Sequence, residues 1–213
     1  MELHHIVKEP KNKLDKNPAL ILLHGYGSNE EDLFSFASEF PEEYFIISAQ
    51  APLNLMYGSY AWYAINFDAD ASKFSDINQA VSSRDVVANF IDQCIEKYHL
   101  DAAAINLFGF SQGAILSMAV ALSYPKKINK VGAFSGYLNT DILRAEGINK
   151  SNNTTKFFIS HGIVDQVIPV EWARKSKPYL ENLGIDVVYK EYPMGHGISP
   201  QNFFDFKNWL ISK

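Results

Sequence analysis

Short aliphatic runs alternate along this chain with longer segments of helical spacing, and this alternation constrains the fold most strongly. The run at 19–23, Ala-Leu-Ile-Leu-Leu, contains no polar residue. A strand without polar alternation is typical of a sheet that is buried on both faces, as parallel sheets are. Strands are predicted at 19–23, 43–48, 104–109, 130–135, 156–160 and 186–190, and helices at 31–40, 78–98, 112–124, 170–183 and 200–212. The sequence therefore predicts an α/β fold with a mostly parallel central sheet and helices on both faces.

Three further segments belong to the single domain that we expect over residues 1–213. The residues around 5–7 predict an antiparallel edge strand ahead of the first parallel strand. The aromatic-rich segment 52–76 and the polar, turn-rich segment 137–155 fit neither a strand nor a helix pattern. Long connections in compact domains are usually functional or mobile, so the packing of these two segments is expected to set the depth of any pocket.

Composition excludes several classes of protein. Hydrophobic residues make up 47% of the chain, enough for a sizeable core, and the formal net charge of −5 argues against a nucleic-acid partner. The chain has one cysteine, Cys94, so no internal disulfide is expected. Cys94 lies in an apolar stripe at helical spacing and is interpreted as a core residue. No signal-peptide pattern and no apolar run of about 20 residues occur, which predicts a cytoplasmic protein without a membrane span.

The string Gly109-Phe110-Ser111-Gln112-Gly113 is the strongest functional signal. Such a string arises by chance in about one chain in fifteen of this length, so the string alone is weak evidence. Here it joins a predicted strand at 104–109 to a predicted helix at 112–124, which is the strand-turn-helix context of a nucleophile elbow. The alternative is a tight turn with an incidental serine. We interpret Ser111 as a nucleophile exposed at the carboxyl end of a buried strand.

A serine nucleophile needs a base, and the base needs a carboxylate that orients it. In this kind of fold the acid and then the base follow the serine, each after a later strand. Asp165 follows the strand at 156–160, and His196 lies between two glycines after the strand at 186–190. Asp141 and Asp186 are weaker candidates for the acid, and His161 is expected to hold the acid loop.

Acyl transfer also needs hydrogen-bond donors for the oxyanion of the tetrahedral intermediate. The backbone N–H of Gln112, directly after the nucleophile, is one candidate. The glycine-containing loop at 23–28 suggests the backbone N–H of Tyr26 as the other. No metal-ligand spacing and no phosphate or dinucleotide fingerprint occurs in the sequence, so neither a metal nor a cofactor is expected.

These motifs resemble the phospholipase/carboxylesterase family, which includes acyl-protein thioesterases and small bacterial carboxylesterases. The resemblance rests on motifs between about residue 20 and residue 200: His24-Gly25-Tyr26-Gly27, Ala51-Pro52, Ala61-Trp62-Tyr63, the string around Ser111, His161-Gly162 with Asp165 and Pro169, and Gly195-His196. Ala114, which follows Gly113, stands where many members of the family have a third glycine-like small residue, and little effect is expected because alanine is also small.

The resemblance implies an α/β-hydrolase fold without a large lid domain and often a homodimer. It implies a triad of Ser111, Asp165 and His196, with oxyanion donors at Tyr26 and Gln112. It also implies that Trp62 helps to line an acyl pocket, although from the residues alone Trp62 could equally be a core residue. Members of the family act on short-chain esters, lysophospholipids or thioesters, so the substrate stays open.

The leading hypothesis is a serine hydrolase that cleaves small-molecule esters or thioesters through an acyl-enzyme intermediate. One alternative is a serine peptidase or amidase on the same fold. Another is a catalytically silent hydrolase that serves as a binding module.

Overall fold

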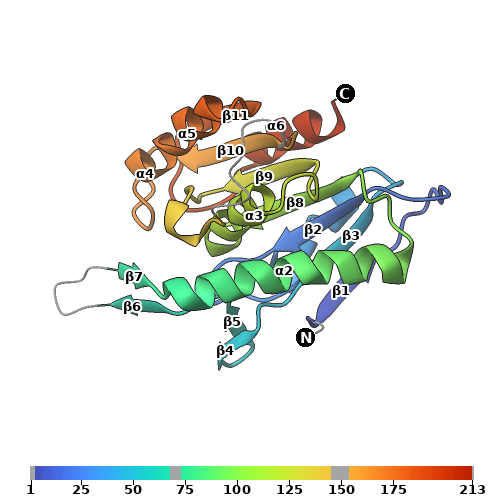
Figure 1. Cartoon of the computed structure of the whole chain (residues 1–213). Helices are drawn as coiled ribbons and strands as arrows, with labels where there is room; N and C mark the ends of the chain where they lie inside the picture. The colour runs from blue at the N-terminus through green and yellow to red at the C-terminus, as the bar shows by residue number, and fades with distance from the viewer. Residues whose placement is uncertain (1–2, 68–72, 145–153, 213) are drawn as a thin grey trace.

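A seven-stranded sheet forms the centre of the computed structural model, which describes residues 3–67, 73–144 and 154–212 (Figure 1). Its strands are β1 (His5–Lys8), β2 (Ala19–Leu23), β3 (Phe45–Ala49), β8 (Ile105–Phe110), β9 (Lys130–Phe134), β10 (Lys156–Gly162) and β11 (Val187–Tyr192). They lie in the order β1-β3-β2-β8-β9-β10-β11, and only the pair β1–β3 is antiparallel. The predicted mostly parallel sheet and its antiparallel edge strand are therefore confirmed.

The strand order fixes where a ligand can bind. The chain continues from β2 to β3 on one side and from β8 to β9 on the other side. In open α/β sheets, ligands bind beyond the carboxyl ends of the strands where the connections diverge in this way. The loops that follow β2 and β8 are therefore the expected location of the site.

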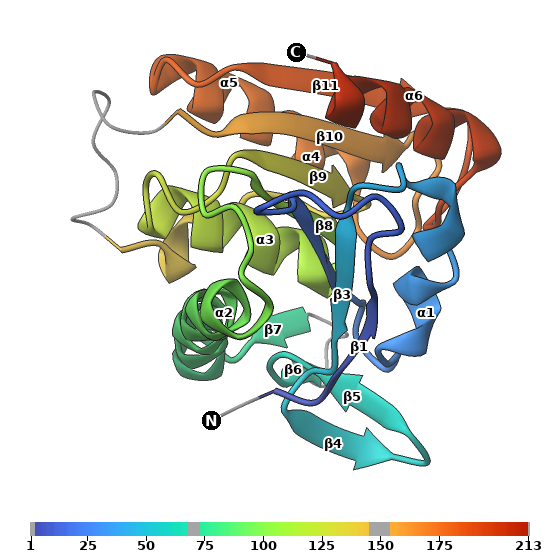
Figure 2. The same cartoon turned by 90° about the vertical axis from the view of Figure 1, so that its right-hand side faces the viewer.

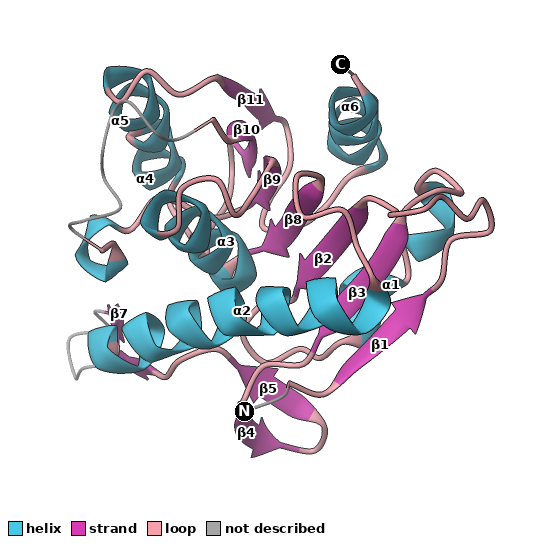
Figure 3. Cartoon of the chain, turned by 45° about the vertical axis from the view of Figure 1, so that its right-hand side comes forward, coloured by secondary structure: helices cyan, strands magenta, loops and turns pink. Residues whose placement is uncertain are grey.

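Helices cover both faces of the sheet, as predicted (Figures 2 and 3). On one face, α2 (Ile77–Tyr98), α3 (Gln112–Ser123) and α5 (Ser176–Asn182) pack over residues such as Ile21 and Leu107. On the other face, α1 (Glu31–Phe34) and α6 (Pro200–Ile211) pack over residues such as Leu22 and Phe108. Alternate residues of one strand thus enter different cores, which explains why the strands contain no polar alternation.

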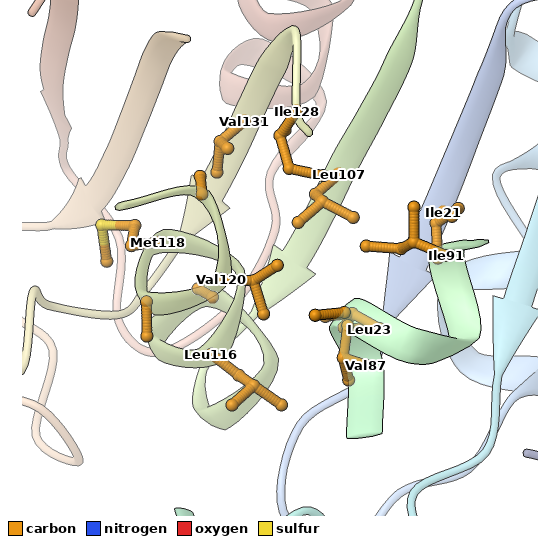
Figure 4. Packing of buried hydrophobic residues seen from close by; sticks show 14 of the residues in the cluster. Ile21, Leu23, Val87, Ile91, Leu107, Leu116, Met118, Val120, Ile128 and Val131 are labelled. Atoms are coloured by element: carbon orange, nitrogen blue, oxygen red, sulfur yellow. The ribbon is translucent and has the colours of Figure 1, made fainter. Parts of the chain in front are cut away.

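The helix behind Ser111 is buried along its whole length. Every residue of α3 is buried, and small residues let this helix lie close to the sheet. Figure 4 shows side chains of α3, among them Leu116 and Val120, beside Leu107 of the sheet and Val87 of α2. Cys94 also belongs to this core, as its sequence position indicated.

Two predicted helices are shorter than expected. The helix predicted at 31–40 consists of α1 and a separate 3-10 turn at Ala37–Glu39. The helix predicted at 170–183 is divided into α4 (Val170–Arg174) and α5. Pro178 has no N–H to donate to the carbonyl of Arg174, so the hydrogen-bond ladder is interrupted at this point.

The segment 52–76 forms two small hairpins that the sequence analysis did not predict. They are β4 (Leu53–Met56) with β5 (Ser59–Ala61), and β6 (Ile65–Phe67) with β7 (Lys73–Ser75). Tyr57 and Gly58 connect β4 to β5 with positive φ angles of 49° and 76°, the combination that a tight two-residue hairpin turn requires. The other unassigned segment begins with a 3-10 turn at Thr140–Ile142, and its residues 145–153 lie outside the described part of the chain.

Candidate active site

Ser111 occupies a sharp turn between β8 and α3. Its φ of 52° and ψ of −116° are unusual for a residue with a side chain. A Cβ atom on Gly109 would overlap the carbonyl group of Gly113, and a Cβ atom on Gly113 would overlap the carbonyl group of Leu23. Both glycines of the string are therefore required for strand and helix to approach each other as closely as they do.

The structure brings the three predicted triad side chains together at the carboxyl end of the sheet. Ser111 follows β8, Asp165 follows β10 and His196 follows β11. The Oγ of Ser111 lies 3.0 Å from Nε2 of His196, and Nδ1 of His196 lies 2.8 Å from Oδ2 of Asp165. In a neutral imidazole, Nδ1–H would donate to the carboxylate and Nε2 would accept from the serine hydroxyl. This is the hydrogen-bond order that a serine nucleophile and its base require.

The carboxylate of Asp165 is buried, and both of its oxygens accept hydrogen bonds. Oδ1 accepts hydrogen bonds from the backbone N–H groups of Val167 and Ile168, at 2.8 and 2.9 Å. Burial by itself raises the pKa of Asp165, but the hydrogen bonds from Ile168, His196 and Val167 outweigh it and hold the pKa below its usual value. Asp165 is therefore ionised near neutral pH.

His161 lies fully buried beneath the acid loop. Its Nε2 is 2.9 Å from the carbonyl oxygen of Ile168, to which it donates a hydrogen bond, and 3.3 Å from Oδ2 of Asp165. These contacts agree with the expectation that His161 holds the acid loop. The rival acids lie elsewhere, since Asp141 is in a 3-10 turn and Asp186 precedes β11.

Tyr26 and Gln112, the predicted sources of oxyanion donors, both border the cavity beside Ser111. Within the described part of the chain, the backbone N–H of neither residue donates a hydrogen bond to another protein group. The next N–H groups of the Tyr26 loop are occupied: Gly27 donates to Tyr60, at 2.9 Å, and Ser28 donates to Gly25, at 3.3 Å. Both predicted donors are thus available to a ligand.

A cavity of about 300 Å³ opens beside Ser111. Its walls are mainly apolar and aromatic and include Tyr63, Ile65, Phe110, Ile115, Tyr137, Val167, Ile168 and Trp172. Trp172 packs edge-to-face on Tyr137, with ring centroids 5.2 Å apart. The size and the lining are those of a site for a small, largely apolar ligand group.

Trp62 does not lie where the family resemblance implied. It is only 1% exposed, is absent from the cavity wall, and belongs to the core between the sheet and α2. Its neighbour Tyr63 and the following Ile65 line the cavity instead. Both Trp62 and Tyr63 are 1% exposed and belong to that core, but only Tyr63 also borders the cavity, a difference that the sequence pattern alone could not assign.

The described residues contain neither a candidate cluster of metal ligands nor a candidate membrane-spanning helix. No group of three or more His, Cys, Asp or Glu side chains among them could hold a metal ion. None of the helices in that part of the chain has the length and apolar character needed to span a bilayer.

Known proteins resemble this chain in sequence. A family model described as Phospholipase/Carboxylesterase matches residues 4–212. A probable carboxylesterase from Oryza sativa subsp. japonica is 36% identical over 108 residues, which are 49% of this chain and 41% of that protein. Acyl-protein thioesterase 1 from Emericella nidulans is 28% identical over 218 residues, which are 92% of this chain and 91% of that protein. The match thus spans about two fifths of the plant protein but nearly all of the fungal one.

Solved structures resemble it in fold. The crystal structure of esterase PE8 has a TM-score of 0.84 and 23% identity, and the match covers 99% of this chain and 98% of that chain. The Bacillus cereus carboxylesterase has a TM-score of 0.83 and 20% identity, with 98% and 93% coverage. These likenesses confirm the predicted α/β-hydrolase fold, and over the described residues no large lid domain is inserted. With a family model that matches from residue 4 to residue 212, this chain belongs to the phospholipase/carboxylesterase family.

Proposed function

We propose that this protein is a serine hydrolase that cleaves carboxylic esters or thioesters through an acyl-enzyme intermediate. The observation that carries the proposal is the hydrogen-bonded series from Ser111 through His196 to Asp165 at the mouth of an apolar cavity. The family and its named relatives, carboxylesterases and acyl-protein thioesterases, support the same reaction class.

In the first half of the reaction, Oγ of Ser111 attacks the carbonyl carbon while Nε2 of His196 accepts the hydroxyl proton. The carbonyl oxygen becomes an oxyanion that accepts hydrogen bonds from the N–H groups of Tyr26 and Gln112. When the tetrahedral intermediate collapses, the bond to the leaving oxygen or sulfur breaks. His196 gives its proton to that atom, which departs as an alcohol or a thiol.

In the second half, a water molecule attacks the acyl-enzyme and His196 accepts one of its protons. The ester bond to Ser111 then breaks, Oγ regains a proton from His196, and the carboxylic acid leaves. Asp165 stabilises the imidazolium in both halves and holds the imidazole in the tautomer with hydrogen on Nδ1. No other group is needed to balance these steps.

The cavity wall favours a substrate with an apolar acyl group. Cavity-lining side chains such as Ile65, Tyr137 and Trp172 offer aromatic and aliphatic surface next to the position that the acyl carbon would occupy. An acyl chain gains free energy when it leaves water for such a surface. We therefore expect the preference among substrates to depend on the acyl part.

The experiment is a series of aryl esters and acyl thioesters of increasing acyl length, tested with the native protein and with Ser111→Ala. The native protein should turn over at least one series and react with a fluorophosphonate probe, and Ser111→Ala should lose both properties while keeping its circular dichroism spectrum. Full activity in Ser111→Ala would refute the mechanism. Failure of the native protein to react with the probe would favour a silent binding module, and faster cleavage of anilides than of esters would favour an amidase.

Four further features complete the proposal. Residues 1–213 act as one hydrolase domain, and the reaction uses no cofactor. The protein acts in the cytoplasm. A homodimer is predicted from the family resemblance, and light scattering of the purified protein would test it.

A further inference from the structure

The side chain of Gln112 is held on both its polar atoms by a segment that lies far away in sequence. Oε1 accepts a hydrogen bond from the backbone N–H of Trp62 at 2.8 Å, and Nε2 donates to the backbone carbonyl of Tyr63 at 2.7 Å. Gln112 is only 2% exposed, so both bonds are shielded from water. The residue proposed to supply one oxyanion donor is thus tied to the segment 62–63.

The same segment is also tied to the loop that supplies the other proposed donor. Nε1 of Trp62 donates a hydrogen bond to the backbone carbonyl of His24 at 2.9 Å. The rings of Trp62 and His24 lie against each other with centroids 5.6 Å apart. The hydroxyl of Ser83 in α2 donates to the carbonyl of Trp62 and anchors the segment to the long helix. Trp62 therefore joins the loop containing Tyr26 to the turn containing Gln112.

His24 completes the connection as a neutral side chain. It is fully buried, with Nδ1 2.8 Å from the carbonyl oxygen of Gly25 and Nε2 3.1 Å from the backbone nitrogen of Ala51. Since Ala51 N–H can only donate and the carbonyl can only accept, Nδ1 must carry the hydrogen and Nε2 must accept. The imidazole thereby holds the chain directly before Tyr26.

We propose that the side chains of Gln112, Trp62 and His24 are positioning residues that set the distance between the two oxyanion donors. This inference rests on the proposed hydrolase function. An oxyanion donor is effective only within about 2.7–3.1 Å of the oxygen that it stabilises. The Tyr26 loop and the Ser111 turn follow different strands, and glycines flank Tyr26, so contacts with other segments must fix its backbone. Gly27 donates to Tyr60 after Tyr26, and the bonds of His24 hold the chain before it. A displacement of about 1 Å in such a site can lower the rate by about 100-fold.

The test compares the steady-state kinetics of Gln112→Met and Trp62→Phe with those of the native protein on one short aryl ester. Gln112→Met keeps the backbone N–H, the length and the burial of the side chain but removes both hydrogen bonds. Trp62→Phe keeps an aromatic ring but removes the bond to His24. We expect kcat to fall by about 10- to 100-fold in each variant while KM changes by less than about threefold. Affinity for an alkyl boronic acid, which forms a tetrahedral adduct with the serine, should fall in parallel with kcat.

Asn106→Leu is the matched control for the loss of a buried amide. Asn106 in β8 is 2% exposed and donates to the carbonyls of Ala19 and Ala104 at the opposite end of the strand from Ser111. The Asn106→Leu variant should have a lower melting temperature but an unchanged kcat, when all variants are assayed well below their melting temperatures. Unchanged kcat in folded Gln112→Met would overturn the inference, and so would an equal loss of kcat in Asn106→Leu. An inactive native protein would instead refute the proposed function itself.

Discussion

The two halves of the candidate site are held in different ways. Ser111, Asp165 and His196 follow strands of the central sheet, and the backbone of that sheet determines where they lie. Trp62 and Tyr63 belong to a connection between β5 and β6, outside the central sheet, and side-chain hydrogen bonds to Gln112 and His24 attach them to it. The sheet thus supplies the reactive groups, and the connection supplies part of the cavity wall and a brace between the two donor loops.

The sharpest test of the first half is Asp165→Asn. The amide keeps the shape of the side chain but cannot stabilise an imidazolium or enforce the tautomer with hydrogen on Nδ1, so we expect kcat to fall by about 1,000- to 10,000-fold. Aryl ester hydrolysis measures the effect. Asp186→Asn, just before the last strand, is the control and should keep native kcat. A fall of less than tenfold in Asp165→Asn would mean that Asp165 does not orient His196.

The dependence of the Ser111 turn on close packing is tested by Gly113→Ala. The added methyl group would overlap the carbonyl of Leu23, so strand and helix must separate. We expect the free energy of unfolding to fall by about 1–3 kcal/mol, the usual cost of overpacking a buried site. Urea unfolding measures it, with Gly197→Ala as control because a Cβ atom there meets no atom within 4 Å. Equal stability of the two variants would contradict the packing argument.

The smallest expected effect is the contribution of His24 to the pH dependence of stability. The carbonyl of His24 accepts the hydrogen bond from Trp62. Burial lowers the pKa of His24 below its usual value, and the bond to Gly25 only partly opposes this. The unfolded chain therefore binds a proton below about pH 6.5 that the folded protein does not bind, and stability falls as the pH decreases. The contribution of one such group is at most about 1.4 kcal/mol per pH unit.

Unfolding experiments between pH 7.5 and pH 5 on native protein and on His24→Gln would measure this contribution. The native protein should lose stability more steeply than the variant below about pH 6.5, whatever the stability difference at pH 7.5. Parallel pH profiles would show that His24 does not stay neutral in the folded protein. Because the other histidines are common to both proteins, they do not affect the comparison.

The triad residues, which follow strands of the central sheet, could be predicted from sequence. The placement of Trp62 and Tyr63, in the connection between β5 and β6, could not. Continuous aliphatic runs identify buried parallel strands, and the residues after such strands must meet at one edge of the sheet. Ser111, Asp165 and His196 each follow such a strand, so the sequence predicts that their side chains lie together. This prediction depends only on the order of the elements, which the alternation of strand and helix patterns indicates directly.

The hairpins at 53–75 have no comparably clear pattern. Their strands are three or four residues long, and the β4–β5 turn uses Tyr57-Gly58 rather than the more usual Asn-Gly or Asp-Gly. Trp62 and Tyr63 lie between β5 and β6, and the sequence could not show that Tyr63 borders the cavity whereas Trp62 lies only in the core. The hydrogen bonds of the Gln112 side chain join residues about 50 positions apart, so no local pattern indicates them.

The positive φ of Ser111 also restricts which other nucleophile could stand at this position. A residue branched at Cβ is strongly disfavoured at φ near 52°, whereas an unbranched side chain can be accommodated there at some cost. Threonine carries the same hydroxyl group as serine but is branched at Cβ, and cysteine is not. The backbone of the turn therefore accommodates cysteine in place of Ser111 more readily than threonine. The backbone conformation, and not only the chemistry of the side chain, thus restricts which nucleophile can occupy this position.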